Sequence, residues 1–376
     1  MRGYLTALIL STCFLGFSQE MRIGILRSQT VKRVSFSYNN GTYNVYGDAN
    51  HVGSIIANQS IEVTVIGGKL KLSYNGVDQG AFSIISVQGS GAMAVKSISP
   101  SVKERKYQNS FEITLRSGKI TIVNQVPMEN YLCGVLESEA GGGRHAEYYK
   151  VQALMSRTYA LKNKVRHKEE GFNLCDGVHC QAYHNMLRFT PAIRIAVRET
   201  KGEVLVDKSK KIVTTYFSAN CGGQICDASY VWNTSVPHVQ SFLDTFCIHT
   251  KQSRWTKRVS QSAWKKFLVN QYGYPIHDSA MNAMIYDFTQ NQRKAFYIHP
   301  SLGIPLRDLR TQFNLKSTFF STHPEGTDVV IEGRGFGHGV GLCQEGAMNM
   351  AQDSYTYQQI ALYYFTGLQI KKFAEL

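Results

Sequence analysis

Short runs of alternating or clustered apolar residues, typical of β-strands, occupy the chain from about residue 21 to 125. Clear examples lie at 23–26, 34–38 and 61–66. Turn residues separate such runs, and Gly67-Gly68 and Asn75-Gly76 are typical of tight hairpins. We therefore predict a β-rich N-terminal module over residues 19–125, and we see no catalytic constellation within it.

The spacing of apolar residues becomes helical after Pro127. A stripe with the spacing of one helix face predicts a helix that begins near His145, and it consists of Val151, Leu154, Met155, Thr158 and Leu161. Further helices are predicted at 192–198, 342–351 and 356–365. Two strands, 204–206 and 212–217, are predicted to pair with each other across the turn at 207–210.

A mixed segment with many basic residues and two tryptophans, Trp255 and Trp264, interrupts this pattern. We interpret it as an inserted subdomain over residues 249–327. The prediction is then an α+β fold, in which the β-rich module is followed by a mixed α/β core made of residues 126–248 and 328–376.

The first eighteen residues have the pattern of a signal peptide. Arg2 precedes a nearly unbroken apolar run, and small residues stand at the positions expected for cleavage. The alternative is a buried N-terminal helix. No later stretch has 18 uninterrupted apolar residues, so we expect a mature chain without a transmembrane segment, exported to the periplasm or cell surface.

Composition and charge narrow the classes of partner. Of 376 residues, 43% are hydrophobic and 18% are charged, which excludes a disordered or collagen-like chain. Lys and Arg number 41 against 27 Asp and Glu, and this net charge of +14 favours polyanionic partners. Export argues against nucleic acid, so an acidic wall or surface glycan is the expected partner.

Four segments carry a family resemblance: 126–139 (VPMENYLCGVLESE), 152–161 (QALMSRTYAL), 196–223 and 333–347 (GRGFGHGVGLCQEGA). In this order they resemble the SpoIID/LytB group of secreted bacterial cell-wall proteins. The resemblance covers roughly 126–248 and 328–376. Where the family has a stiff pair after Ser138-Glu139, this chain has Ala140 and three glycines.

The resemblance implies lytic cleavage of peptidoglycan glycan strands, or stimulation of a cell-wall amidase. Lytic transglycosylation needs a single Glu that donates a proton and then accepts one, because the C6 hydroxyl of the substrate is the nucleophile. We assign this role to Glu139, which we expect at the mouth of the glycine loop rather than inside an element. The alternatives are that Glu139 caps the following helix, or that Glu129 is the acid; Glu137 we interpret as a solvated charge.

His338 lies between two glycines of the fourth segment, where it could reach a ligand, and we expect it to line the site. Weaker candidates for sugar contacts are Arg157, Gln181, Tyr183 and Gln344.

Cysteines suggest a metal site or disulfides. Cys175, His179 and Cys180 resemble a family segment that binds zinc in some members, and two thiolates with an imidazole suit Zn²⁺. The fourth ligand could be His167, His184, Cys221 or water. In an oxidising compartment the same cysteines, or Cys221 with Cys226, could instead form disulfides, or the thiols could be free. A zinc ion here would be structural and would fix the loop that carries Gln181 and Tyr183.

The sequence thus predicts an exported peptidoglycan lytic transglycosylase. A non-catalytic enhancer of a cell-wall amidase is the alternative, and a surface adhesin that binds through its β module is a third interpretation.

Overall fold

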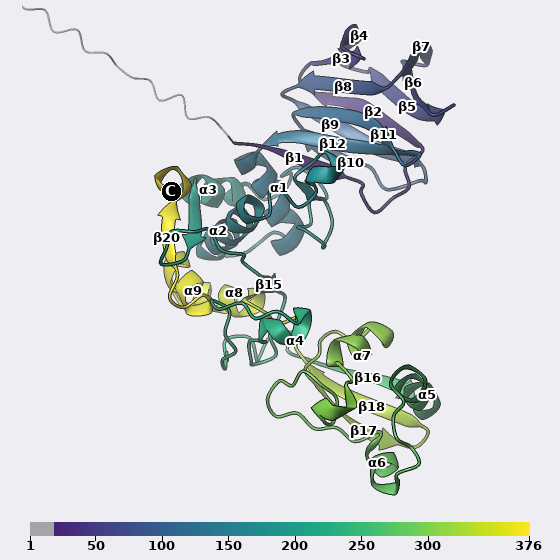
Figure 1. Cartoon of the computed structure of the whole chain (residues 1–376). Coiled ribbons are helices and arrows are strands. Elements are labelled where there is room, and N and C mark those ends of the chain that lie inside the picture. Colours follow the sequence, from purple (N-terminus) through teal and green to yellow (C-terminus); the bar gives the residue numbers. More distant parts are fainter. Residues whose placement is uncertain (1–18) are drawn as a thin grey trace, which may run out of the picture. The chain divides into compact units, whose positions relative to one another are not determined.

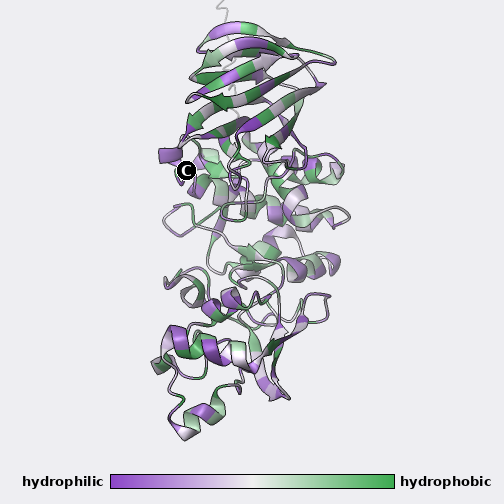
Figure 2. Cartoon of the chain, turned by 90° about the vertical axis from the view of Figure 1, so that its right-hand side faces the viewer, coloured by the Kyte–Doolittle hydropathy of each residue, from purple (hydrophilic) through white to green (hydrophobic). Residues whose placement is uncertain are grey.

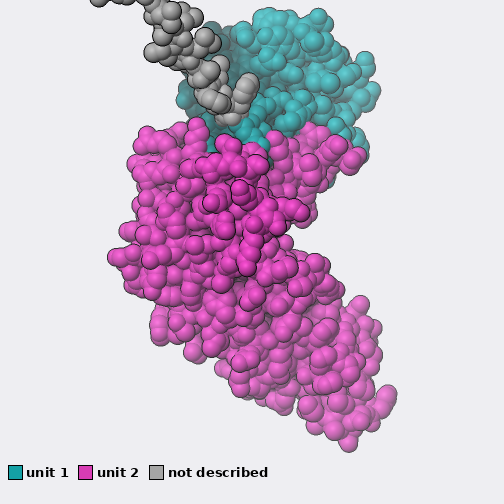
Figure 3. Space-filling model, turned by 60° about the vertical axis from the view of Figure 1, so that its left-hand side comes forward, with its two compact units in different colours: residues 1–131 teal, residues 132–376 magenta. Residues whose placement is uncertain are grey.

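The computed structural model describes residues 19–376, so the predicted signal peptide lies outside the described residues. The chain divides into two compact units, residues 1–131 and 132–376 (Figure 3). The fold is α+β, as predicted (Figure 1). No helix of residues 19–376 has the length and apolar character needed to cross a bilayer.

The described part of the first unit is built from strands. They are β1 (Glu20–Ile25), β2 (Arg33–Asn40), β3 (Tyr43–Gly47), β4 (Asn50–Ile55), β5 (Ser60–Ile66), β6 (Lys69–Tyr74), β7 (Val77–Phe82), β8 (Ile84–Gly89), β9 (Ala92–Ser99), β10 (Arg105–Gln108), β11 (Ser110–Arg116) and β12 (Lys119–Pro127). Within this unit they form two antiparallel layers, ordered β1-β12-β11-β8-β3-β4 and β10-β9-β2-β5-β6-β7.

Alternating apolar positions produce this sandwich, because every second side chain of a strand points to the same face. Figure 2 shows the alternation as bands along the strands. Phe36 of β2 and Phe111 of β11 meet between the layers, with ring centroids 5.3 Å apart. Gly67-Gly68 and Asn75-Gly76 all have positive φ, which confirms the two predicted hairpin turns, β5–β6 and β6–β7.

Helices dominate the beginning and the end of the second unit. They are α1 (Met128–Ala140), which contains the division between the units, α2 (Ala146–Lys162), α3 (Pro191–Glu199), α4 (Ala228–Trp232), α8 (Gln344–Gln352) and α9 (Tyr357–Tyr364), with short 3₁₀ turns at Lys168–Glu170 and Phe373–Glu375. The predicted helix start near His145 is confirmed, since the His145 side chain caps α2 by accepting from the N–H of Glu147. α2 is buried along most of its length and packs against α3, α8 and α9.

The predicted pairing of 204–206 with 212–217 is confirmed only beside the turn, where Val206 and Ile212 form an isolated antiparallel bridge and the N–H of Val213 donates to the carbonyl of Leu205. The strand partner of β14 (Glu203–Val206) is β20 (Gln369–Lys372). Of the second segment only β15 (Phe217–Ser218) is a strand, parallel to β19 (Leu342–Cys343). β13 (Leu174–Cys175) is equally short. β20, which is distant in the sequence, occupies the position beside β14 where we expected residues 212–217.

Residues 254–334 have a hydrophobic core of their own. β16 (Arg254–Ser260), β18 (Asp328–Arg334) and β17 (Phe320–Glu325) form a three-stranded sheet in that order. The remaining elements of this segment are α5 (Gln261–Tyr272), α6 (Ser279–Met284), a 3₁₀ turn at Pro300–Leu302 and α7 (Leu306–Gln312). Trp264 is the largest fully buried side chain, and it stacks on Phe313 with centroids 4.8 Å apart.

Candidate functional site

Glu139 lies in the last turn of α1, inside an element and not in the loop after it as we expected. The helix continues to Ala140, and Gly141, with φ of +66°, follows it in the left-handed conformation that typically ends helices. The alternative role as a cap of the following helix is wrong as well, because His145 is the residue that caps α2.

The end of α1 holds the backbone of residues 182–190 through three consecutive side chains. Glu137 accepts from the N–H groups of Arg188 (2.8 Å), Phe189 (2.9 Å) and Thr190 (2.9 Å). Ser138 Oγ accepts from the N–H of His184 at 3.1 Å, and Glu139 Oε1 accepts from the N–H of Ala182 at 2.8 Å.

Glu137 therefore is not the solvated charge that we expected. Its carboxylate satisfies N–H groups at the start of α3, where Thr190 is the N-cap residue but makes no side-chain capping bond. Gly134 of α1 sits so close to this segment that an added Cβ would collide with the carbonyl oxygen of Asn185. α1 and the 182–190 segment are thus one tightly fitted assembly.

The half-buried position of Glu139 changes its proton affinity. Loss of hydration raises the pKa of the Glu139 carboxyl above its ordinary value, and the hydrogen bond from Ala182 only partly opposes this. The loop beside it is open, since Gly142 and Gly143 are exposed, and a Cβ added to Gly141 or Gly143 would meet no atom within 4 Å. A carboxyl of raised pKa thus stands next to backbone that a large ligand can approach.

A row of buried polar side chains follows one face of α2 at helical spacing. The Tyr148 hydroxyl, both amide atoms of Gln152 and the Ser156 hydroxyl are buried without a hydrogen-bond partner among residues 19–376. Burial raises the pKa of Tyr148, and the nearby charge of Glu139 adds to this effect. The spacing i, i+4, i+8 was visible in the sequence between the apolar positions, but our sequence interpretation did not use it.

Three of the residues expected to contact sugar, Gln181, Tyr183 and Gln344, are buried at different places in the core. Gln181 is buried and its Nε2 donates to the carbonyl of Ser156 at 3.4 Å, beside the polar row. Tyr183 is fully buried against Gly134. Gln344 begins α8, and its Nε2 is buried without a partner among the described residues.

Arg157 has a different environment from the one expected. Its guanidinium is buried, and it donates to the carbonyls of Glu203 (3.3 Å) and Val197 (3.2 Å) at the end of α3 and the start of β14. A buried cation at a helix C-terminus satisfies carbonyls that the helix leaves unpaired. This placement makes Arg157 a cross-link between α2 and α3 and not a surface group open to glycan.

His338 belongs to an aromatic cluster. Its ring lies 5.2 Å from that of Trp232, which stacks on Tyr216 at 4.6 Å. Nδ1 accepts from the N–H of Val340 at 3.0 Å, and a hydrogen bond with the backbone of Phe217 also engages the ring. Burial, with Arg310 and Arg293 nearby, lowers the pKa of His338 to about 4, which keeps its imidazole neutral at neutral pH.

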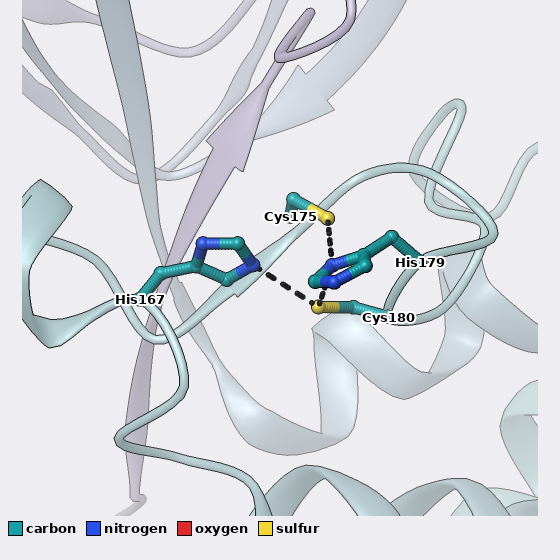
Figure 4. A group of neighbouring side chains, drawn as sticks. All are labelled: His167, Cys175, His179 and Cys180. Atoms are coloured by element: carbon teal, nitrogen blue, oxygen red, sulfur yellow. Dashed lines mark hydrogen bonds between the residues drawn. The ribbon is translucent and has the colours of Figure 1, made fainter. Parts of the chain in front are cut away.

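Four metal-ligating side chains converge beyond the end of α2. His167, Cys175, His179 and Cys180 point toward one another (Figure 4), and their ligand atoms all lie within 4.8 Å of each other. Cys180 Sγ is 3.4 Å from His167 Nε2 and 3.6 Å from His179 Nδ1, while Cys175 Sγ is 3.7 Å from His179 Nδ1. The structure thus adds His167 to the three expected ligands, whereas Cys221 lies in another cluster.

The donor set fits a zinc ion. Two thiols and two imidazoles form one of the common tetrahedral sets, and His167 is oriented by Glu170, whose Oε1 lies 2.7 Å from Nδ1. Binding through Nδ1 of His179 requires the proton on Nε2, so the 3.4 Å contact from Arg166 would have to open. None of the seven cysteines of residues 19–376 forms a disulfide in the structure.

Comparisons with known proteins agree with one another. A family model described as "Stage II sporulation protein" matches residues 116–206, which include Glu139 and the four-ligand cluster. An uncharacterised protein of Brachyspira hyodysenteriae is 29% identical over 270 residues, covering 70% of this chain and 72% of that protein.

Two named relatives come from Bacillus subtilis. "Stage II sporulation protein D" is 26% identical over 265 residues, covering 66% of this chain and 76% of the relative. "Amidase enhancer" is 25% identical over 293 residues, covering 64% of this chain but 40% of the relative.

Proposed function

Because this chain carries a SpoIID/LytB-family domain, we propose that it is an exported protein that remodels peptidoglycan by lytic transglycosylation, with Glu139 as its catalytic carboxyl. The raised pKa of Glu139 is the observation that carries this proposal. A general acid must hold its proton near the working pH, and partial burial is the usual means by which a carboxyl achieves this.

The reaction requires one group that works twice. Protonated Glu139 donates to the glycosidic oxygen as the bond from that oxygen to the anomeric carbon breaks. The C6 hydroxyl of the muramic acid residue attacks the same carbon and returns its proton to the Glu139 carboxylate. The products are a 1,6-anhydro-muramic end and a free hydroxyl on the other fragment, so neither water nor a second carboxylate is consumed.

The surroundings of Glu139 suit this role. Oε1 accepts from Ala182, whereas Oε2 has no hydrogen bond within residues 19–376 and is available to the substrate. The exposed glycine loop after α1 gives a sugar chain room to approach. The charge of Glu139 acts on Tyr148, whose hydroxyl has no hydrogen-bond partner among the described residues. We therefore propose that Tyr148 orients the carboxyl of Glu139 or a hydroxyl of the sugar.

The other groups play supporting roles. A zinc ion held by His167, Cys175, His179 and Cys180 would supply a structural cross-link in the loop that leads to Gln181 and Ala182. His338 is neutral, and its ring is hydrogen-bonded to the backbone of Val340 and Phe217, so it supports the loop that carries it. The net charge of +14 favours association with an anionic wall, modestly at physiological salt.

A second candidate function is the enhancement of a cell-wall amidase. The similarity to "Amidase enhancer" over 64% of this chain favours it, and such a role needs no catalytic carboxyl. The amidase would then be the protein partner, and Glu139 would be dispensable.

Digestion of purified peptidoglycan, intact and amidase-stripped, tests the proposal. The chain would be compared with its Glu139→Gln and Glu129→Gln variants, and the products would be identified by mass spectrometry. We expect 1,6-anhydro-muramic ends from the wild type and Glu129→Gln, and none from Glu139→Gln. Glu129 is the matched control because it lies in the first turn of the same helix.

Other outcomes would change the assignment. Reducing ends would indicate hydrolysis and a water-activating base. Cleavage by Glu139→Gln but not by Glu129→Gln would move the acid to Glu129. No cleavage by any of the three, combined with stimulation of an added amidase that survives Glu139→Gln, would establish the enhancer in place of the lyase.

A further inference from the structure

A second group of metal-ligating side chains lies in the core of the second unit, formed by Cys221, Asp244, Cys247 and Cys343. All four residues are fully buried, and their ligand atoms all lie within 4.8 Å of one another. They come from three separate segments: the glycine-rich turn after β15, the segment around residue 245, and the residue that precedes α8.

The distances are those of a collapsed tetrahedral site. Cys221 Sγ lies 3.3 Å from Cys247 Sγ and 3.2 Å from Asp244 Oδ2. Ligands around a tetrahedral zinc ion, at ~2.0–2.3 Å from the metal, stand about 3.5–3.8 Å from each other. A small outward movement of these side chains would therefore accommodate the ion.

Backbone N–H groups donate to one of the sulfurs. Cys343 Sγ accepts from the N–H groups of Cys221 (3.3 Å) and Gly346 (3.4 Å). Such donors stabilise negative charge on sulfur, which a metal-bound thiolate carries and a disulfide does not.

The carboxylate is oriented in the same manner. Asp244 Oδ1 accepts from the N–H of Phe246 at 3.1 Å, and Oδ2 accepts from the Tyr364 hydroxyl at 3.1 Å. Gly346 is required at this point, because a Cβ there would collide with the Tyr364 hydroxyl and lie 3.1 Å from Asp244 Oδ2. Three thiols and a carboxyl brought together without water form a ligand set that a divalent cation would occupy once the thiols lose their protons.

We propose that Cys221, Cys247, Cys343 and Asp244 bind a structural zinc ion, at a site separate from the one that contains Cys175 and Cys180. Three sulfurs and one carboxylate oxygen complete a closed tetrahedral set, which leaves no open position for a substrate. Through Cys343 the ion would cross-link the start of α8, where Gln344 lies, to residues 221–247. This proposal does not depend on the proposed lytic activity.

Cobalt binding to the folded chain tests the site, because Co²⁺ replaces zinc and gives a thiolate charge-transfer band. The Cys175→Ser/Cys180→Ser variant removes the sulfurs of the first cluster. We expect this variant to bind one Co²⁺ per chain with the band, and addition of Cys247→Ser to abolish both. Circular dichroism checks that each variant is folded, and a folded double variant without the band would overturn the proposal.

Two further measurements keep the test decisive. If the double variant does not fold, the zinc content of the wild-type chain is compared with that of Cys343→Ser: a loss of one ion per chain supports the site, and equal content overturns it. Peptide mapping of the non-reduced wild type is the second. A Cys221–Cys247 disulfide in most molecules would overturn the metal assignment, whereas free thiols together with bound zinc support it.

Discussion

Replacement of Glu137 by alanine gives a sharp test of the way α1 holds its neighbour. The carboxylate accepts three backbone N–H groups, from Arg188, Phe189 and Thr190, at 2.8–2.9 Å. It also lies at the N-terminus of α3, whose own N-cap residue makes no side-chain cap. Alanine would remove all of these contacts without disturbing the helix propensity of α1.

The expected loss of stability follows from the environment of the three donors. A buried hydrogen bond to a charged group contributes ~1.5–3 kcal/mol, but two of these N–H groups are exposed, so water can partly replace the carboxylate. Allowing ~0.5–1 kcal/mol for each of the three bonds and ~0.5 kcal/mol for the helix dipole gives about 2–3.5 kcal/mol. For a unit of this size the melting temperature should fall by about 5–10 °C.

Chemical and thermal unfolding would measure the loss, and amide hydrogen exchange would locate it. We expect peptides that cover residues 188–190 to exchange at least tenfold faster in Glu137→Ala, with Glu137→Gln intermediate because its amide oxygen still accepts. Glu199→Ala is the matched control, since its exposed ion pair with Lys150 should contribute less than ~1 kcal/mol. A loss no larger than that of the control, with unchanged exchange at 188–190, would refute the reasoning.

Three more substitutions have definite expected outcomes. Because burial raises the pKa of Glu139, ionisation of this carboxyl lowers the stability of the folded chain as the pH rises. Glu139→Gln should therefore have a higher melting temperature than the wild type at pH 8 and the same melting temperature below the ordinary pKa of 4.5. A lower melting temperature of the variant at pH 8 would contradict this. Gly134→Ala should destabilise the chain in urea although alanine favours a helix by ~1 kcal/mol, because its Cβ would collide with the carbonyl of Asn185. Trp264→Ala should cost ~3–5 kcal/mol and unfold residues 254–334 in limited proteolysis, whereas Met284→Ala at an exposed position should not.

Local signals predicted the local structure well. The hairpins at Gly67-Gly68 and Asn75-Gly76 follow from backbone conformations that few other residue pairs adopt. The beginning of α2 near His145 was equally predictable, because the apolar stripe of that helix and the glycines before it were both visible.

The helix that carries Glu139 was missed, although the sequence held signals for it. Glu129 just after Pro127 is typical of a first helical turn, and Gly141 is typical of the position after a last one. We interpreted the stretch between them only as a family motif. Glu139 was therefore identified as the candidate acid while its place in the fold was wrong.

Contacts between distant segments were beyond prediction. The guanidinium of Arg157 is buried because it donates to carbonyls at the end of α3 and the start of β14. No spacing in the sequence reveals that a cation is needed there. The cluster around Cys221 likewise requires residues more than 120 positions apart to meet. Such groups become visible only after the helices and strands are assembled.

The pairing of β14 with β20 has a consequence for the order in which the protein can mature. Glu203 lies opposite Lys372, and the two side chains also form an ion pair across 169 residues of chain. A nascent chain that ends after α7 therefore still lacks β20, the strand that pairs with β14. The candidate acid on α1 is synthesised early, but the core that supports α2 beside it closes only when residues 369–372 arrive. We expect nascent chains shorter than this to remain protease-sensitive around α2 and β14, while the β-rich first unit is already resistant.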